Sequence, residues 1–219
     1  MRRGRLAEYA YEYTKRMLFD GRLAPGAKLR VEDVVASLRT SRQPVMDAFK
    51  RLASEGYLEI TPQVGCRVVV PDAAEIADFF LILGAVQGLA ADIAAGRHTP
   101  SEADRFRALA DAIDASAADP LTPEAAHATH VLDHDFQQQL RSMAHSDAVE
   151  RLAAGLLDRR DFYITCVPNG EFAFAERMLA ARGAHRAIVD AVAAGSADLA
   201  RSRSEALIVA LGQFSPRIN

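Results

Sequence analysis

The sequence contains no tryptophan and only two cysteines, Cys66 and Cys166. Two distant cysteines match neither a disulfide framework nor a paired zinc-ligand spacing, so we expect two ordinary thiols. No stretch approaches the roughly 20 unbroken apolar residues that a membrane span needs, and the amino terminus has no apolar segment after its arginines. We therefore predict a soluble cytoplasmic protein with no membrane contact.

Half of the 219 residues are apolar and a quarter are charged, which is ordinary for a globular chain large enough to bury a core. The charge is unevenly distributed. Residues 1–72 hold 13 Lys and Arg against 9 Asp and Glu, net +4, whereas the remainder holds 13 against 20, net −7. Because phosphate neutralisation supplies most non-specific DNA affinity, the basic part is the candidate for a nucleic-acid partner. All six histidines lie in the acidic part, where metal chemistry would be sought.

The first 72 residues predict three short helices followed by a β-hairpin. Helices are expected over residues 5–19, 31–38 and 42–55, with Ser41 as the N-cap of the third. The first helix should bury the apolar and aromatic positions spaced by three and four, namely Leu6, Tyr9, Ala10, Tyr13, Met17 and Leu18. Two β segments, 57–61 and 66–70, are joined by a turn at 62–65. This order is typical of a winged helix-turn-helix.

The rest of the sequence is strongly helical. Asp72 and Glu75 form a capping box, so a helix should start directly after the hairpin. Further start signals place helices at roughly 73–96, 100–117, 122–144, 146–166, 171–194 and 197–213. The predicted fold is therefore mainly α, with an N-terminal winged helix-turn-helix over 1–72 and a C-terminal all-α bundle over 73–219.

The third helix has two distinct faces. An apolar stripe of Val45, Ala48, Phe49 and Leu52 should face the core, leaving outward Arg42, Gln43, Met46, Asp47 and Lys50. In a helix-turn-helix the outward amino end of the second helix reads base edges in the major groove. Arg42 suits bidentate contact with guanine, and Gln43 suits adenine or phosphate. A polar helix face taken alone is more often a solvent-exposed surface than a DNA-binding one. Here the turn before the helix and the predicted wing after it favour DNA binding.

Four short segments match a known pattern in order and spacing: LAPG at 23–26, SRQPV at 41–45, RLASEG at 51–56 and PQVG at 62–65. Together they resemble the GntR family of transcription regulators. The resemblance implies a homodimer that inserts this helix and the wing into a pseudo-palindromic double-stranded operator, with Arg42 at a base-contacting position. The family usually has a second arginine where this chain has Met46, which either contacts a thymine methyl or is a tolerated surface residue. The expected DNA contacts are Arg30, Ser41, Arg42, Gln43, Pro44, Met46, Lys50 and Gly65.

The helical part is similar to the effector domain of the FadR subfamily, called FCD, with the match carried by residues 87–95, 132–136 and 185–191. In many such domains an Asp and three His bind a divalent metal (Zn, Ni or Mn) that helps to hold an organic acid. Here Asp133 and His185 match two ligands, but Gln137 and Leu207 stand where two histidines are expected. We therefore expect weak or absent metal binding.

The effector cavity implied by the resemblance is less charged than usual, because Leu83 and Gln87 replace an arginine and a glutamate. The ligand is therefore expected to be larger or more apolar than a simple organic acid. His130 is either a substitute metal ligand or a polar or surface contact. The expected effector-binding residues are Leu83, Gln87, His130, Asp133, Gln137, His185 and Leu207.

These observations predict a transcriptional regulator that responds to a small-molecule metabolite and is not an enzyme. We expect it to act as a repressor. Two alternatives stay open. The helical part could serve dimerisation only, without an effector. The histidines could instead belong to a metal-dependent helical hydrolase, although the sequence shows no recognisable nucleophile or complete ligand set.

Overall fold

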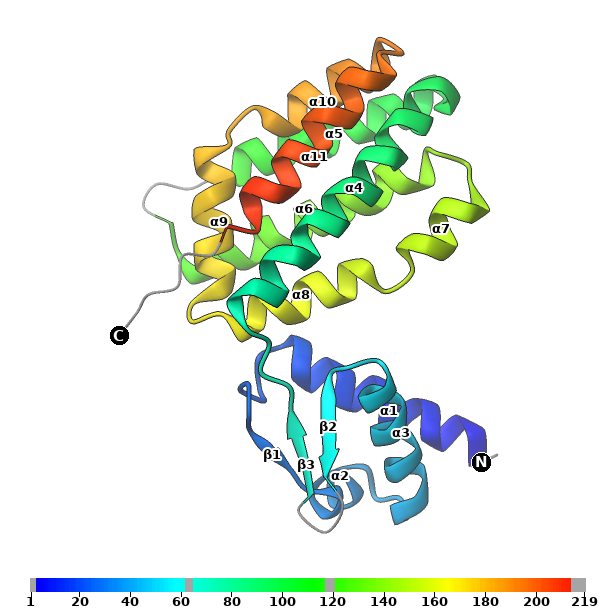
Figure 1. Cartoon of the computed structure of the whole chain (residues 1–219), viewed down its shortest axis with the longest axis vertical. Coiled ribbons are helices and arrows are strands. Elements are labelled where there is room, and N and C mark those ends of the chain that lie inside the picture. Colours follow the sequence, from blue (N-terminus) through cyan, green and yellow to red (C-terminus); the bar gives the residue numbers. More distant parts are fainter. Residues whose placement is uncertain (1–2, 62–64, 117–120, 214–219) are drawn as a thin grey trace. The chain divides into compact units, whose positions relative to one another are not determined.

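The computed structural model describes residues 3–61, 65–116 and 121–213. The chain divides into two compact units (Figure 1). Residues up to Pro71 together with Asp161–Pro168 form the N-terminal unit, and Asp72–Arg160 with the residues from Asn169 onward form the helical unit.

The N-terminal unit contains three helices and a small sheet. The helices are α1 (Arg3–Phe19), α2 (Val31–Leu38) and α3 (Arg42–Ser54), and the strands are β1 (Lys28–Leu29), β2 (Leu58–Thr61) and β3 (Gly65–Val68). The sheet has the order β1-β3-β2 with antiparallel neighbours. The predicted winged helix-turn-helix is confirmed, with one addition, strand β1. This strand is too short to be predicted from a sequence pattern, and it forms by pairing with β3. Residues 62–64 of the predicted turn lie outside the described residues.

The core of this unit follows the predicted stripe of α3. Val45, Ala48, Phe49 and Leu52 are all buried, which places the opposite face of α3 toward solvent. Gly56 ends the helix with a left-handed φ of 74°, a conformation that glycine adopts without strain.

Of the six positions of α1 expected to be buried, Ala10 and Leu18 are buried and Leu6, Tyr13 and Met17 are half-buried, but Tyr9 is wrong. Tyr9 is 55% exposed, and Tyr11 is buried in its place. The reason is tertiary: the Tyr11 ring lies under the guanidinium of Arg51, 3.6 Å from its centroid, and the Tyr11 hydroxyl donates to Glu55 at 2.8 Å.

The helical unit begins with the long helix α4 (Ala73–Arg97), capped as predicted by the Asp72 side chain, which accepts from the Glu75 amide. It continues with α5 (Pro100–Ser116), α6 (Pro123–Ser142), α7 (Asp147–Ala153), α8 (Leu156–Cys166), α9 (Gly170–Ala180), α10 (Ala184–Ala193) and α11 (Ala197–Leu211). The last six residues of α8 belong to the N-terminal unit.

Two predicted helices are each broken in two. The helix expected over 146–166 is interrupted at Gly155, with φ 76°, and the helix expected over 171–194 is interrupted at Gly183, with φ 84°. A left-handed residue stops the i to i−4 hydrogen-bond ladder, and glycine adopts it at little cost. Each glycine therefore separates two helices.

Helices α4 and α11 run side by side in the helical unit (Figure 1). Their close approach depends on Gly88, where an added Cβ would lie 2.4 Å from Cγ of Glu205. Among the described residues, α4 alone is long and apolar enough to cross a membrane by length and composition. However, 56% of that apolar stretch is buried inside the protein, as is usual for a core helix.

Candidate functional sites: a nucleic-acid interface and a buried polar cluster

The outward face of α3 carries the candidate base-reading residues. Arg42, Gln43 and Lys50 are exposed, and Met46 is half-buried. Ser41 occupies the N-cap position with an extended backbone, but its side chain makes no capping hydrogen bond. The amino end of α3 therefore presents polar side chains to solvent.

Two of these side chains are paired with carboxylates of the same unit. Nη1 of Arg42 lies 2.6 Å from Oε1 of Glu32, and the two side chains are 70% and 63% exposed. Nε2 of Gln43 donates to Oδ1 of Asp47 at 2.7 Å. Both pairs are solvent-exposed, so DNA groups can replace the carboxylate partners at low cost.

Three further expected DNA contacts have different surroundings. Pro44 was expected to contact DNA, but it is buried in the first turn of α3 and is therefore not accessible to DNA. Arg30 is exposed at the start of α2. Gly65 is exposed opposite Thr61 in the hairpin with φ 126°, a backbone that favours glycine.

A network that the sequence did not reveal holds α1 against α3. Arg51 bonds Glu8 at 2.9 Å and Glu55 at 3.1 Å while stacking on Tyr11. Burial and the neighbouring Glu55 raise the pKa of Tyr11, so its hydroxyl stays a donor. These contacts fix the helix that carries Arg42.

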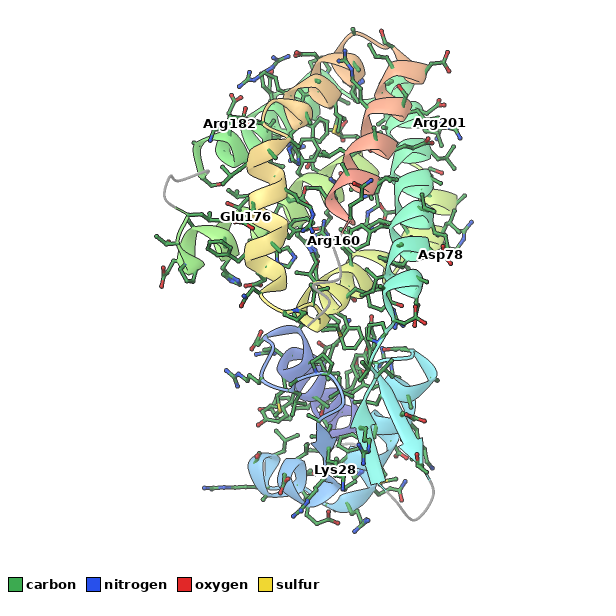
Figure 2. All side chains as sticks on the ribbon, turned by 60° about the vertical axis from the view of Figure 1, so that its left-hand side comes forward. Lys28, Asp78, Arg160, Glu176, Arg182 and Arg201 are labelled. Atoms are coloured by element: carbon green, nitrogen blue, oxygen red, sulfur yellow. The ribbon has the colours of Figure 1, made fainter. Side chains whose placement is uncertain are left out.

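A second candidate site is a hydrogen-bonded cluster inside the helical unit, centred on Asp133 of α6. Arg160 of α8 lies inside this unit (Figure 2), and its Nη1 is 2.5 Å from Oδ2 of Asp133. Oδ1 of Asp133 accepts hydrogen bonds from Nε2 of His185 at 3.0 Å and from Nε2 of Gln137 at 3.3 Å. Nε2 of Gln87 donates to Oε1 of Gln137 at 3.1 Å. All five side chains are buried.

The Asp133 carboxylate is ionised. Burial alone would raise its pKa, but the Arg160 guanidinium and the His185 hydrogen bond outweigh burial and lower the pKa to about 2. An ionised carboxylate only accepts hydrogen bonds, which fixes the direction of both amides. Gln137 must turn its NH2 group to Asp133, and its oxygen then accepts from Gln87.

The hydrogen bonds that run from Asp133 through Gln137 to Gln87 end at the side-chain oxygen of Gln87. Oε1 of Gln87 has no hydrogen-bond partner among the described residues, and neither has the buried hydroxyl of Ser204. Ser204 and Gln87 immediately precede Glu205 and Gly88, which are in close contact between α11 and α4. Two unsatisfied polar atoms thus lie in a buried layer where such groups are rare.

The seven residues expected to bind an effector are all buried, but they do not form one cluster. Gln87, Asp133, Gln137 and His185 are connected by hydrogen bonds, whereas Leu83 and Leu207 belong to the apolar core. His130 is engaged elsewhere: its Nδ1 lies 3.2 Å from Oε1 of Glu171, and its ring packs against Phe174.

Arg160 is the functional candidate that sequence reasoning missed. It stands beside another arginine in a polar stretch of α8, and nothing in the local pattern distinguishes the buried residue from its neighbour. Its partner is 27 residues away in the sequence.

The cluster does not fit a divalent metal. Within residues 3–61, 65–116 and 121–213, no group of three or more His, Cys, Asp and Glu side chains is placed to hold an ion. Asp133 and His185 are the two matching ligands, and both are bonded to each other and, through Asp133, to Arg160. A metal there would need further donors, which the described residues do not place beside Asp133 and His185.

A three-helix unit with a wing and an exposed polar α3, joined to a helical unit with a polar core, defines a class: the winged-helix transcription regulators. Comparison with known families specifies it further. Residues 6–68 match the bacterial regulatory proteins of the gntR family, and residues 78–210 match the FCD domain. The chain is a GntR-family transcriptional regulator with an FCD domain. Members of this group are regulators rather than enzymes, so the hydrolase alternative is set aside.

Curated relatives match only part of the chain. The probable D-xylose utilization operon transcriptional repressor of Paenarthrobacter nicotinovorans is 37% identical over 36% of this chain and 34% of its own length. The transcriptional repressor RspR of Escherichia coli K12 is 33% identical over 42% and 40%. The chain thus spans well under half the length of these relatives.

Solved structures resemble the whole fold. A GntR transcriptional regulator from Rhodococcus sp. RHA1 has a TM-score of 0.70 at 22% identity, covering 97% of this chain and 100% of that one. E. coli McbR/YncC has a TM-score of 0.67 at 17% identity, covering 93% of each chain. At these identities the likeness concerns the fold alone.

Proposed function

We propose that this protein is a sequence-specific repressor that binds double-stranded operator DNA as a homodimer and releases or retains it in response to a small metabolite. Its place of action is the cytoplasm. The observation that carries the DNA-binding part is the amino end of α3, where Arg42 and Gln43 are exposed and Met46 is half-buried, opposite a buried core stripe. Lys50 lies further along and suits a phosphate.

Dimerisation is supported by an apolar face of α4. Leu81, Ile82 and Leu89 are 55%, 58% and 37% exposed, and their spacing places them on one side of the helix. A second copy of this chain would bury them and present two α3 helices to adjacent half-sites, which is how a two-fold protein reads a pseudo-palindrome.

The helical unit is the proposed effector site. The side-chain oxygen of Gln87 and the hydroxyl of Ser204 are buried polar atoms without partners among the described residues, and each such atom costs free energy until a ligand or water satisfies it. A small molecule that bonds these atoms would favour one arrangement of the dimer over another. Differential affinity for the two arrangements is what changes operator binding.

Genome-wide mapping of bound DNA, followed by fluorescence anisotropy on the recovered sites, tests the DNA-binding part. We expect a recurrent pseudo-palindrome whose duplex binds at least roughly tenfold more tightly than a scrambled duplex at the same salt concentration. Equal binding to both duplexes would contradict sequence-specific regulation.

One observation favours a second function, a dimeric DNA-binding protein without effector. Both oxygens of Asp133 are already engaged by Arg160, His185 and Gln137. A thermal-shift screen of metabolites separates the two functions, because a ligand that binds only the folded state raises the melting temperature. A flat response to every metabolite would favour the dimerisation-only function.

A further inference from the structure

We propose that Arg160 is the resident cation of the buried site, standing where related domains hold a divalent metal, so that this helical unit folds and functions without one. The inference concerns the same site as the proposed effector function. It stands whether or not an effector binds, because it rests on the contacts of Asp133 alone.

Charge compensation is the first step. Asp133 is fully buried, and a buried carboxylate needs a cation and hydrogen-bond donors around it. The Arg160 guanidinium, itself 0% exposed, supplies the cation at 2.5 Å, and His185 and Gln137 supply donors to the other oxygen. The charge that a metal would balance is therefore already balanced within the chain.

The state of His185 is the second step. Because the ionised Asp133 can only accept, the Nε2 atom of His185 carries the proton in the 3.0 Å hydrogen bond between them. A metal at Nε2 would have to displace this proton and break the hydrogen bond to Asp133. His185 thus acts as a donor to Asp133 in the position where the resemblance implies a ligand.

Electrostatic repulsion is the third step. A divalent ion on Asp133 would share one buried carboxylate with the guanidinium, and two cations within a few ångströms in a low-dielectric interior repel strongly. The histidines of the resemblance are absent at Gln137 and Leu207, so no donors offset that repulsion. Arg160 and a metal therefore exclude each other.

The experiment uses the full chain, purified without a histidine tag. Metal analysis should find well under about 0.1 Zn, Ni or Mn per chain, because fewer than three ligands do not hold such ions tightly. Neither EDTA nor added Zn²⁺ or Ni²⁺ should move the melting temperature by more than about 1 °C. A metal at a thousandfold excess over its dissociation constant would raise it by about 8 °C or more. Stoichiometric metal, or a marked loss of stability in EDTA, would overturn the proposal.

Variants test the role of Arg160 directly. Arg160→Met leaves a buried charge uncompensated and should lower the melting temperature by about 6–20 °C, whereas Arg105→Met, at an exposed arginine of α5, should change it by less than about 2 °C. Adding Asp133→Asn to Arg160→Met should recover at least half of the loss, since the orphaned charge is then gone.

The double variant also covers the case in which Arg160→Met fails to fold. No recovery on adding Asp133→Asn, or an Arg160→Met variant as stable as Arg105→Met, would show that Arg160 is not the counter-ion. A protein that does not bind duplex DNA, but whose melting temperature does not change in EDTA, would contradict the proposed function and leave this inference standing.

Discussion

Replacing Arg42 by alanine separates DNA reading from folding. The Arg42 side chain is 70% exposed and its ion pair with Glu32 is exposed on both sides. Exposed pairs contribute about 0–1 kcal/mol, so the free energy of unfolding should fall by less than about 1 kcal/mol. On the operator, the alanine variant cannot make a bidentate arginine–guanine hydrogen bond. That interaction is worth about 1–3 kcal/mol, so the dissociation constant should rise roughly 5- to 150-fold.

Fluorescence anisotropy at one fixed salt concentration measures both consequences. Binding of Arg42→Ala to the operator duplex should weaken by that factor, and the ratio of operator to scrambled affinity should fall with it. The matched control is Arg22→Ala: Arg22 is 65% exposed in the same unit and pairs with Asp20, but it lies outside α3. If Arg42→Ala kept its specificity ratio, or if Arg22→Ala weakened binding as much, Arg42 would not be the base reader.

Three further predictions concern the salt dependence, the assembly and the acid stability. Lys50→Ala should weaken operator and scrambled duplexes alike and reduce the slope of log K against log salt by about 0.9, as expected when one phosphate is no longer neutralised; a change in specificity instead would assign Lys50 to a base. Leu81→Glu on the apolar face of α4 should give monomers in light scattering, whereas Leu152→Glu, similarly exposed on α7, should leave the dimer intact; monomeric wild-type protein would refute the interface. Because the folded pKa of Asp133 is lowered to about 2, its contribution of about 2–3 kcal/mol is present above about pH 4 and is lost as the pH falls toward 2. Urea midpoints between about pH 5 and pH 2 should therefore fall less steeply for Asp133→Asn, and parallel curves would contradict the ionised, paired carboxylate.

The buried polar cluster was predictable only in part. Gln87, Asp133, Gln137 and His185 were expected from a resemblance, and the structure joins them by hydrogen bonds. Which of them contact an effector stays a prediction. Arg160 could not be found from sequence, because a long-range ion pair leaves no periodicity and arginines are usually exposed.

The sequence by itself determined the features that depend on near neighbours in the chain. The buried stripe of α3, its end at Gly56 and the cap of α4 by Asp72 all follow from helical spacing and from hydrogen bonds within a few residues. These local preferences were enough to predict a winged unit followed by a helical one.

Tertiary structure decided what depends on distant partners. Strand β1 exists only because β3 pairs with it, and Tyr11 rather than Tyr9 is buried because Arg51 and Glu55 are far from it in the sequence and beside it in space. The charge balance of Asp133 likewise required Arg160 from another helix. Burial removes water as the alternative partner, so each such group depends on whichever residue the fold brings within reach.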